Sequence, residues 1–170
     1  MTAQAVIEPF DPSELTEEEF LLGPDRDDDL DIDDVFSKEF ENIYADQLMF
    51  DRSSVAITPK SLWTPSIVDA DYRFVDVEAG VLLIGPDGKP CGGYIGCDVA
   101  IGWIHRGRGL GSELILEYAM RHGRLPTWDL DEASYSTDGY RAHCNAHAMA
   151  RDRVFFDRKR QALKDAASGK

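Results

Sequence analysis

The stretch "VAIGWIHRGRGLGSELILEY", Val99 to Tyr118, passes through three sequence patterns in succession. Its first residues are apolar and typical of a strand, and Arg106–Gly111 then holds three glycines and two arginines. Apolar residues follow at helical spacing, at Leu114, Ile115, Tyr118 and Ala119. The stretch therefore predicts a strand that leads through a glycine-rich turn into a helix, with more glycine than a turn alone requires.

Residues 106–111 have the chemistry of an anion-binding site. The first N–H groups of a helix lack partners within the helix and lie at the positive end of its dipole. Glycine lets the backbone approach phosphate oxygens, and Arg106 and Arg108 supply charge-assisted donors. A pyrophosphate suits this turn. A Walker loop needs a Lys after its glycines, and the dinucleotide fingerprint has another glycine spacing in a parallel βαβ unit, so neither is favoured.

Length and composition favour one globular domain over residues 1–170. The chain is 43% hydrophobic, and it contains no apolar run of about eighteen residues that would suggest a membrane span. Its first residues have neither a basic region nor an uninterrupted apolar region, so we expect no secretory signal. The three cysteines (Cys91, Cys97, Cys144) are odd in number and lack C-x-x-C spacing. We therefore expect reduced thiols and a cytoplasmic location.

The formal net charge of −14 is unevenly distributed. Residues 1–100 hold 23 acidic and 6 basic side chains, whereas residues 101–170 hold 9 acidic and 12 basic ones. An acidic surface repels nucleic acid at long range and favours a cationic small molecule or a basic protein segment. We expect neither nucleic acid nor a membrane as a partner.

The first third of the chain predicts a short strand at 5–10 and two helices. One helix begins near Ser13 or Thr16, and the other carries an apolar stripe at Phe36, Phe40, Ile43, Tyr44 and Leu48. Between them, about 23–34, lies an acidic segment that we expect to be a solvated, flexible linker. Its acidic run lacks the glycine and the glutamate that a calcium loop needs at its sixth and twelfth positions. Residues 51–66 have the composition of a connecting segment.

From residue 72 the pattern alternates, which predicts an antiparallel meander of three strands. The strands are expected at 72–78, 81–85 and 91–103, and the glycines of the third mark a bulge or a close approach of another backbone. A short strand near 127–130 and a helix over 137–166 complete the chain. The expected fold is α/β of the α+β type, with a mostly antiparallel central sheet flanked by helices in the order β-α-α-β-β-β-α-β-α.

The segment "AIGWIHRGRGLGSELI" resembles the acetyl-CoA-binding segment of the GNAT superfamily of N-acetyltransferases, whose signature is [Q/R]-x-x-G-x-[G/A]. The order of elements is also similar to theirs. The resemblance implies that acetyl-CoA is a co-substrate, that backbone amides of the turn hold its pyrophosphate, and that the preceding strand pairs with its pantetheine arm. By position, the implied binding residues are Ala100, Ile101, Gly102, Trp103, Arg106, Gly107, Arg108, Gly109, Leu110, Gly111 and Ser112.

The catalytic groups are less well indicated. Family members usually carry N-x-x-A-x-x-x-Y, where the tyrosine protonates the departing thiolate, but this chain has Asp152 at that position after Asn145 and Ala148. Tyr135 and Tyr140 lie near in sequence, and we take Tyr140 as the candidate acid. Asp98, before the turn, is the candidate base, with a surface residue as the equal alternative. His105 is either a base or a solvated turn residue.

The segment "HCNAH" places His143 and His147 four residues apart, a spacing that zinc sites use. No obvious third ligand follows, so we predict no metal site and expect paired polar residues near a helix surface. The basic residues of the last helix predict a solvated face.

Three functions are consistent with these patterns. The first is transfer of acetyl from acetyl-CoA to a primary amine, either a cationic small molecule or a lysine side chain. The second is a catalytically inactive protein of the same kind that binds acyl-CoA, and the third is an acidic interaction protein with a basic partner. A homodimer is compatible with the resemblance, because dimers are common in that family.

Overall fold

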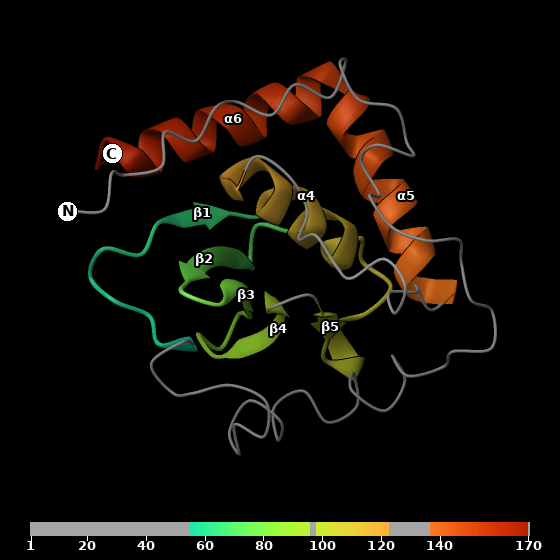
Figure 1. Cartoon of the computed structure of the whole chain (residues 1–170), viewed down its shortest axis with the longest axis horizontal. Coiled ribbons are helices and arrows are strands. Elements are labelled where there is room, and N and C mark those ends of the chain that lie inside the picture. Colours follow the sequence, from blue (N-terminus) through green and yellow to red (C-terminus); the bar gives the residue numbers. More distant parts are fainter. Residues whose placement is uncertain (1–54, 96–97, 123–136, 170) are drawn as a thin grey trace, which may run out of the picture.

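In the part of the chain that the structure describes, a five-stranded antiparallel sheet forms one layer and three helices form the other (Figure 1). The computed structural model describes residues 55–95, 98–122 and 137–169. Its elements are β1 (Trp63–Pro65), β2 (Arg73–Val77), β3 (Gly80–Ile84), β4 (Pro90–Ile95), β5 (Asp98–Ile101), η3 (Trp103–His105), α4 (Leu110–His122), α5 (Thr137–Arg151) and α6 (Arg153–Ala167). The prediction of an α+β fold with an antiparallel sheet is confirmed.

The sheet follows chain order, β1-β2-β3-β4-β5, so that β3 lies at its centre. The segment expected to be only a connection supplies β1, in which Trp63 pairs with Val75 and Pro65 with Arg73. The prediction of a connecting segment was wrong. It relied on Pro65 as a strand breaker, but proline disrupts a strand only where the sheet needs the N–H that proline lacks. At the edge of a sheet it is tolerated.

The single strand expected at 91–103 is two strands, β4 and β5, which pair as a hairpin with Ile95 opposite Asp98. Alternating apolar residues look the same in one long strand and in a tight hairpin, so the pattern did not show the reversal. Gly92 confirms the expected close approach of another backbone, since a Cβ there would lie 2.9 Å from the carbonyl oxygen of Ala100. The register also shifts opposite this glycine, between Leu83 and Ile84.

The single helix expected at 137–166 is divided into α5 and α6 at Asp152. This residue has extended backbone angles and caps α6, since its carboxylate accepts a hydrogen bond of 3.2 Å from the backbone N–H of Phe155. The break lets α5 pack against α4 and α6 cross over β1 (Figure 1).

Several predicted elements lie outside the described residues. They are the strand at 5–10, the two helices and the acidic segment of the first 50 residues, and the strand near 127–130. Within the described part of the chain, no helix is long and apolar enough to cross a membrane.

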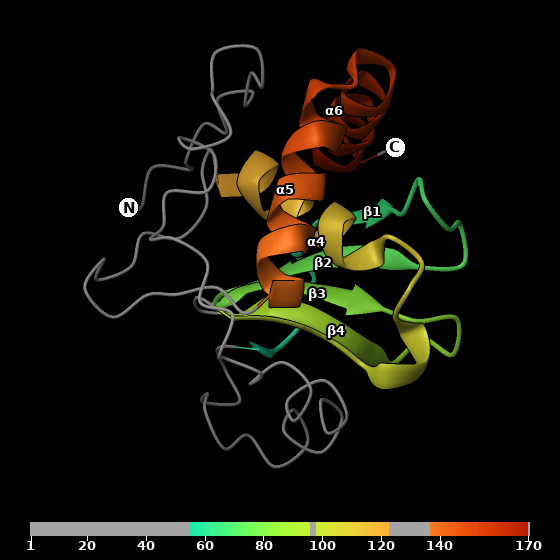
Figure 2. The same cartoon turned by 90° about the vertical axis from the view of Figure 1, so that its right-hand side faces the viewer.

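The three helices cover one face of the sheet (Figure 2). Strand β2 shows why, because its successive side chains point to opposite faces: Phe74 packs into the core with the helices, whereas Val75 and Val77 belong to a second cluster on the other face. Helix α4 fills the centre of the first core. Leu114, Ile115 and Ala119 are fully buried, as the apolar spacing predicted.

Four charged side chains are buried between the helices and the sheet. Glu113, Glu117 and Lys159 are fully buried, and Arg121 is 5% exposed. The ammonium of Lys159, from α6, forms an ion pair with Glu117 and lies 3.6 Å from a carboxylate oxygen of Glu113. The two glutamates occupy successive turns of α4, so one lysine serves both. We call these four residues the buried charge cluster.

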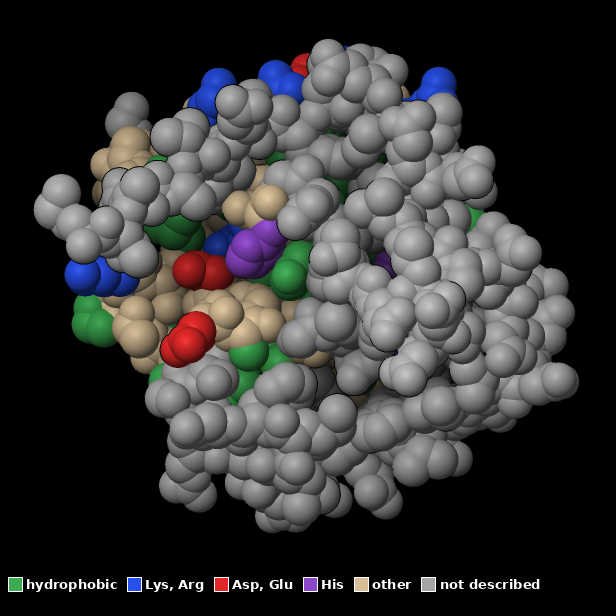
Figure 3. Space-filling model, viewed as in Figure 1, with side chains coloured by type: hydrophobic (Ala, Val, Ile, Leu, Met, Phe, Trp, Pro, Cys, Tyr) green, Lys and Arg blue, Asp and Glu red, His purple; other side chains and the backbone are tan. Residues whose placement is uncertain are grey.

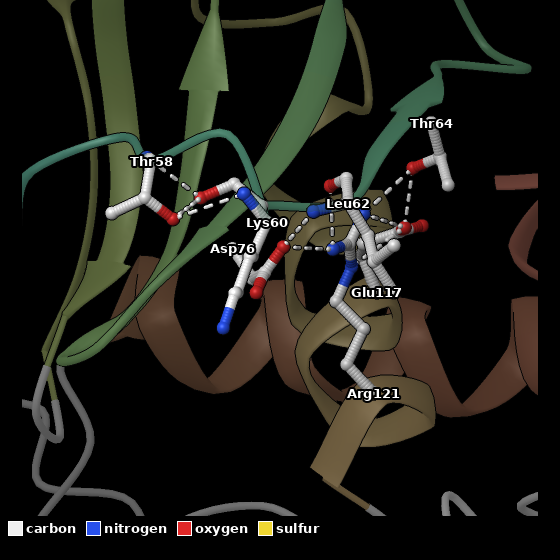
Figure 4. A network of polar contacts seen from close by, with 8 residues as sticks. Thr58, Lys60, Leu62, Thr64, Asp76, Glu117 and Arg121 are labelled. Carbon is white, nitrogen blue, oxygen red and sulfur yellow. Dashed lines mark hydrogen bonds and ion pairs between the residues drawn. The ribbon is translucent and has the colours of Figure 1, made fainter. Parts of the chain in front are cut away.

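Two members of the buried charge cluster, Glu117 and Arg121, also contact strands of the sheet (Figure 4). Arg121 donates to Glu117 at 2.9 Å and forms an ion pair with Asp76 of β2 at 3.2 Å. The hydroxyl of Thr64, in β1, donates to Glu117 at 2.5 Å. Burial alone would raise the pKa of Glu117, but the charges of Lys159 and Arg121 and hydrogen bonds from Lys159 and Thr64 lower it to about 2.

The basic residues of α6 are therefore not all solvated. Lys159 is buried, whereas Arg153, Arg158 and Lys164 are exposed. Figure 3 shows Lys and Arg side chains along the edge of the molecule where α6 lies. The solvated face that the sequence predicts is confirmed for the outer side of the helix only.

Replacing Lys159 with alanine should destabilise the fold strongly, because Glu113 would lose its cation and Glu117 would lose one of its two. We expect Lys159→Ala to lower the free energy of unfolding by about 3–5 kcal/mol. Lys164→Ala, an exposed position of the same helix, should change it by less than about 0.5 kcal/mol. Denaturant unfolding of both variants is the measurement, and equal midpoints would show that the cluster contributes no stability.

Candidate functional site

A cleft of about 330 Å³ lies where β5 leads into α4. One wall is the end of β5, another is the glycine-rich turn with the first turn of α4, and the third is α5. The lining residues are Val99, Ala100, Ile101, His105, Arg106, Gly107, Gly109, Leu110, Gly111, Ser112, Gly139, Arg141, Ala142 and Asn145. The cleft thus contains the strand–turn–helix junction that the sequence predicts as an anion site.

Backbone geometry accounts for the glycines of the turn. Gly107 and Gly109 have φ angles of 78° and 82°, a conformation that side chains other than glycine rarely adopt. The first backbone bond into α4 runs from the N–H of Glu113 to the carbonyl of Gly109, at 3.1 Å. The N–H groups of the preceding helical residues have no partner within the helix, and those residues line the cleft. An anion in the cleft would meet these donors.

Eight of the eleven predicted binding residues line the cleft: Ala100, Ile101, Arg106, Gly107, Gly109, Leu110, Gly111 and Ser112. Gly102 does not line the cleft, and its N–H donates to the carbonyl of Cys91 at 2.7 Å. Arg108 is 51% exposed and points to Asp69, whose carboxylate is 3.5 Å away. The side chain of Trp103 lies outside what the structure describes.

The predicted acid and base occupy described backbone, but their side chains lie outside the described part. Asp98 is the first residue of β5, and Tyr140 is in the first turn of α5. Asp152, which stands where the pattern N-x-x-A-x-x-x-Y has its tyrosine, is exposed and caps α6. The side chain at the tyrosine position thus serves the α5–α6 junction.

His105 is not the solvated turn residue that the sequence allowed as one alternative. It is half-buried, lines the cleft, and its Nδ1 lies 2.7 Å from the hydroxyl oxygen of Tyr72. The two residues are 33 positions apart, and no local pattern links them.

The sequence predicted Tyr140 of α5 as part of the site, but not the residues of this helix that line the cleft. Gly139, Arg141, Ala142 and Asn145 reach the cleft from one side of this helix. Asn145 belongs to the N-x-x-A match that the sequence contains, which was the available signal. Arg141 adds a second basic residue to the lining, beside Arg106.

The histidines of "HCNAH" are buried, which corrects the expected position near a helix surface. His143 is 2% exposed and His147 is 5% exposed. The Nδ1 of His143 lies 2.6 Å from the carbonyl oxygen of Gly139, and its Nε2 lies 3.1 Å from the hydroxyl of Tyr94. Both ring nitrogens therefore have protein partners. Among the described residues, no group of three His, Cys, Asp or Glu side chains is placed to hold a metal ion.

Burial lowers the pKa of His143 to about 4, although the hydrogen bond to Gly139 acts in the opposite direction. The ring is neutral at physiological pH. In that state the Nδ1–H donates to Gly139, and the Nε2 accepts from Tyr94.

Comparison with known proteins gives no match to this chain among family models, curated proteins or solved structures.

The buried neutral His143 should make stability depend on pH. Because its pKa is depressed from about 6.5, its contribution is fully present above pH 6.5 and is lost as the pH falls toward 4. Between pH 6.5 and 4.5, the free energy of unfolding of the original protein should fall by about 2–3 kcal/mol more than that of His143→Gln. Glu117 does not obscure this comparison, since its contribution is lost only below its ordinary pKa.

The measurement is denaturant unfolding of both proteins at several pH values. Slopes against pH are compared rather than absolute stabilities, because the substitution also removes the hydrogen bond from Tyr94. The pKa of His122 is lowered too, mainly by burial, and its contribution is common to both proteins. Parallel slopes would mean that His143 titrates normally in the folded state.

Proposed function

We propose that the cleft binds the pyrophosphate and pantetheine of coenzyme A and that the protein is a GNAT-like N-acetyltransferase. The observation that carries the proposal is the junction itself: β5, a turn with two positive-φ glycines, and the first turn of α4 line one cleft. This arrangement supports anion binding by unpaired N–H groups. Two arginines in the lining, Arg106 and Arg141, suit a doubly charged group.

The position of β5 supports the place assigned to the pantetheine arm. This strand is the last of the described sheet, and it pairs with β4 on one side only. Its residues Val99 to Ile101 line the cleft, so an extended ligand can lie along them. A pantetheine arm has amide groups that pair with a strand edge as another strand does.

In the proposed reaction the nitrogen of a primary amine attacks the thioester carbonyl, the carbon–sulfur bond breaks, and the amide forms. The thiolate of CoA takes up a proton, and the amine nitrogen loses one. The acidic composition of the first hundred residues favours a cationic acceptor, either a small amine or a lysine side chain.

A second function is supported by Asp152, which caps α6 at the position where the family has its acid. In this alternative the protein binds acyl-CoA without transferring the acyl group. The two functions share the cleft and differ only in turnover.

Calorimetry with CoA and acetyl-CoA tests the proposal, followed by an assay for thiol release with polyamines, aminoglycosides and lysine peptides. Binding with thiol release supports the transferase. Binding without release, whichever amine is added, supports the second function. No heat at millimolar CoA overturns both.

Blocking the cleft at Gly111 should abolish CoA binding and leave the fold intact. The φ of this glycine is not positive, and a Cβ there would lie 3.6 Å from Ile101, an ordinary contact. Gly111→Val therefore places two methyl groups in the cleft without backbone strain. We expect at least a tenfold loss of CoA affinity and a melting temperature within a few degrees of the original.

Ala148→Val is the matched control, because Ala148 is exposed on α5 and lies outside the cleft lining. It adds the same bulk and should leave the affinity unchanged. Wild-type affinity in a folded Gly111→Val protein would place the ligand elsewhere.

A further inference from the structure

A buried tyrosine, Tyr72, contacts His105 from the side of the core. Tyr72 precedes β2 and is 3% exposed, within the core that the helices cover. Two hydrogen bonds hold its backbone in place. Its N–H donates to the carbonyl of Asp69, and its carbonyl accepts from the N–H of Ser66. The rings of Tyr72 and His105 meet edge to face at 84°, with centroids 5.5 Å apart. The hydroxyl of Tyr72 is thus a rigid partner for Nδ1.

The direction of this hydrogen bond follows from what else the hydroxyl contacts. Burial raises the pKa of Tyr72, with Asp69, Asp71 and Cys91 acting in the same direction and Arg108 acting against them, so the phenol keeps its proton. Within the described parts of the chain, the hydroxyl has no polar partner besides His105. If Nδ1 carried a proton and donated, the phenol hydrogen would be buried without an acceptor, which is costly. The hydroxyl therefore donates to Nδ1.

A neutral imidazole that accepts at Nδ1 carries its proton on Nε2. His105 lines the cleft beside Arg106 and Gly107, whereas Tyr72 lies on the buried side. Because Nδ1 is engaged by Tyr72, Nε2 is the ring nitrogen left for a ligand in the cleft.

We propose that Tyr72 fixes His105 in the tautomer that directs an Nε2–H into the cleft, where it donates to the anionic group bound at the glycine-rich turn. His105 is then a neutral hydrogen-bond donor and not a base, since its unprotonated nitrogen is occupied by Tyr72. The ligand part of this inference rests on the proposed function, because it takes the anion to be the pyrophosphate of CoA.

Nuclear magnetic resonance of protein labelled with ¹⁵N-histidine tests the tautomer without a ligand. At pH 8 we expect His105, assigned by comparison with His105→Gln, to show a protonated Nε2 and an unprotonated Nδ1. A protonated Nδ1 overturns the inference. Adding CoA or inorganic pyrophosphate should then shift the Nε2 signal, which a purely structural histidine would not show.

Two substitutions of His105 separate the donor from the rest of the ring. Glutamine places an amide N–H near the position of Nε2, so His105→Gln should keep the affinity for CoA within about threefold. Asparagine is too short to place a donor there, and His105→Asn should bind about tenfold more weakly. Tyr72→Phe keeps the packing and removes the hydroxyl, and we expect a loss of about threefold to tenfold, with melting temperatures checked for all three variants.

Calorimetry on the full chain distinguishes the ways in which this can fail. If CoA binds, but the Nε2 signal does not move and His105→Asn binds as tightly as the original protein, the role of His105 is wrong and the proposed function stands. If neither CoA nor pyrophosphate binds the original protein, the proposed function is wrong, and with it the ligand assigned to His105.

Discussion

The interaction on which this structure depends is the pairing of one buried lysine with two buried glutamates. Lys159 of α6 lies against Glu113 and Glu117, which project from successive turns of α4. Charged groups of this kind are costly to bury unless every partner is present, so the contacts must form together. They tie the last helix to the central helix and, through Thr64, to the edge strand of the sheet. Three elements distant in sequence are thereby held in one arrangement.

The same interaction positions the cleft. Glu113 follows the glycine-rich turn by only two residues, and it also accepts hydrogen bonds from the hydroxyl of Ser66 and from the N–H groups of Ile67 and Val68. The side chain of Val68 reaches the turn, since a Cβ on Gly109 would lie 3.5 Å from it. The first turn of α4 is therefore fixed from the core side. The helical residues before Glu113, whose N–H groups have no partner within the helix, line the cleft.

Prediction from sequence succeeded where the signal was local. The glycine-rich turn between a strand and a helix was found, because each part of it has its own pattern over a few residues. The hairpin from β2 to β3 was found for the same reason. The break at Asp152 was missed, since apolar periodicity continues across it, and the cap becomes visible only when its carboxylate is seen to accept from Phe155.

The errors in the sheet have a similar origin. Trp63–Pro65 is too short to show alternation, and it is a strand because β2 offers it a partner. The reversal between β4 and β5 is imposed by pairing, with Gly92 allowing the two backbones to meet.

The sequence by itself determined the glycine-rich turn between a strand and a helix, since glycine conformation and the patterns on either side are properties of adjacent residues. It also determined which side of α4 is apolar. Only the tertiary structure decided that Glu113 and Glu117 are buried, that α5 closes the cleft, and that Tyr72 holds His105. Each of these joins residues that lie far apart in the chain, and such pairs leave no periodic trace in a single sequence. Their free energy comes from the desolvated contact, which exists only after the chain has folded.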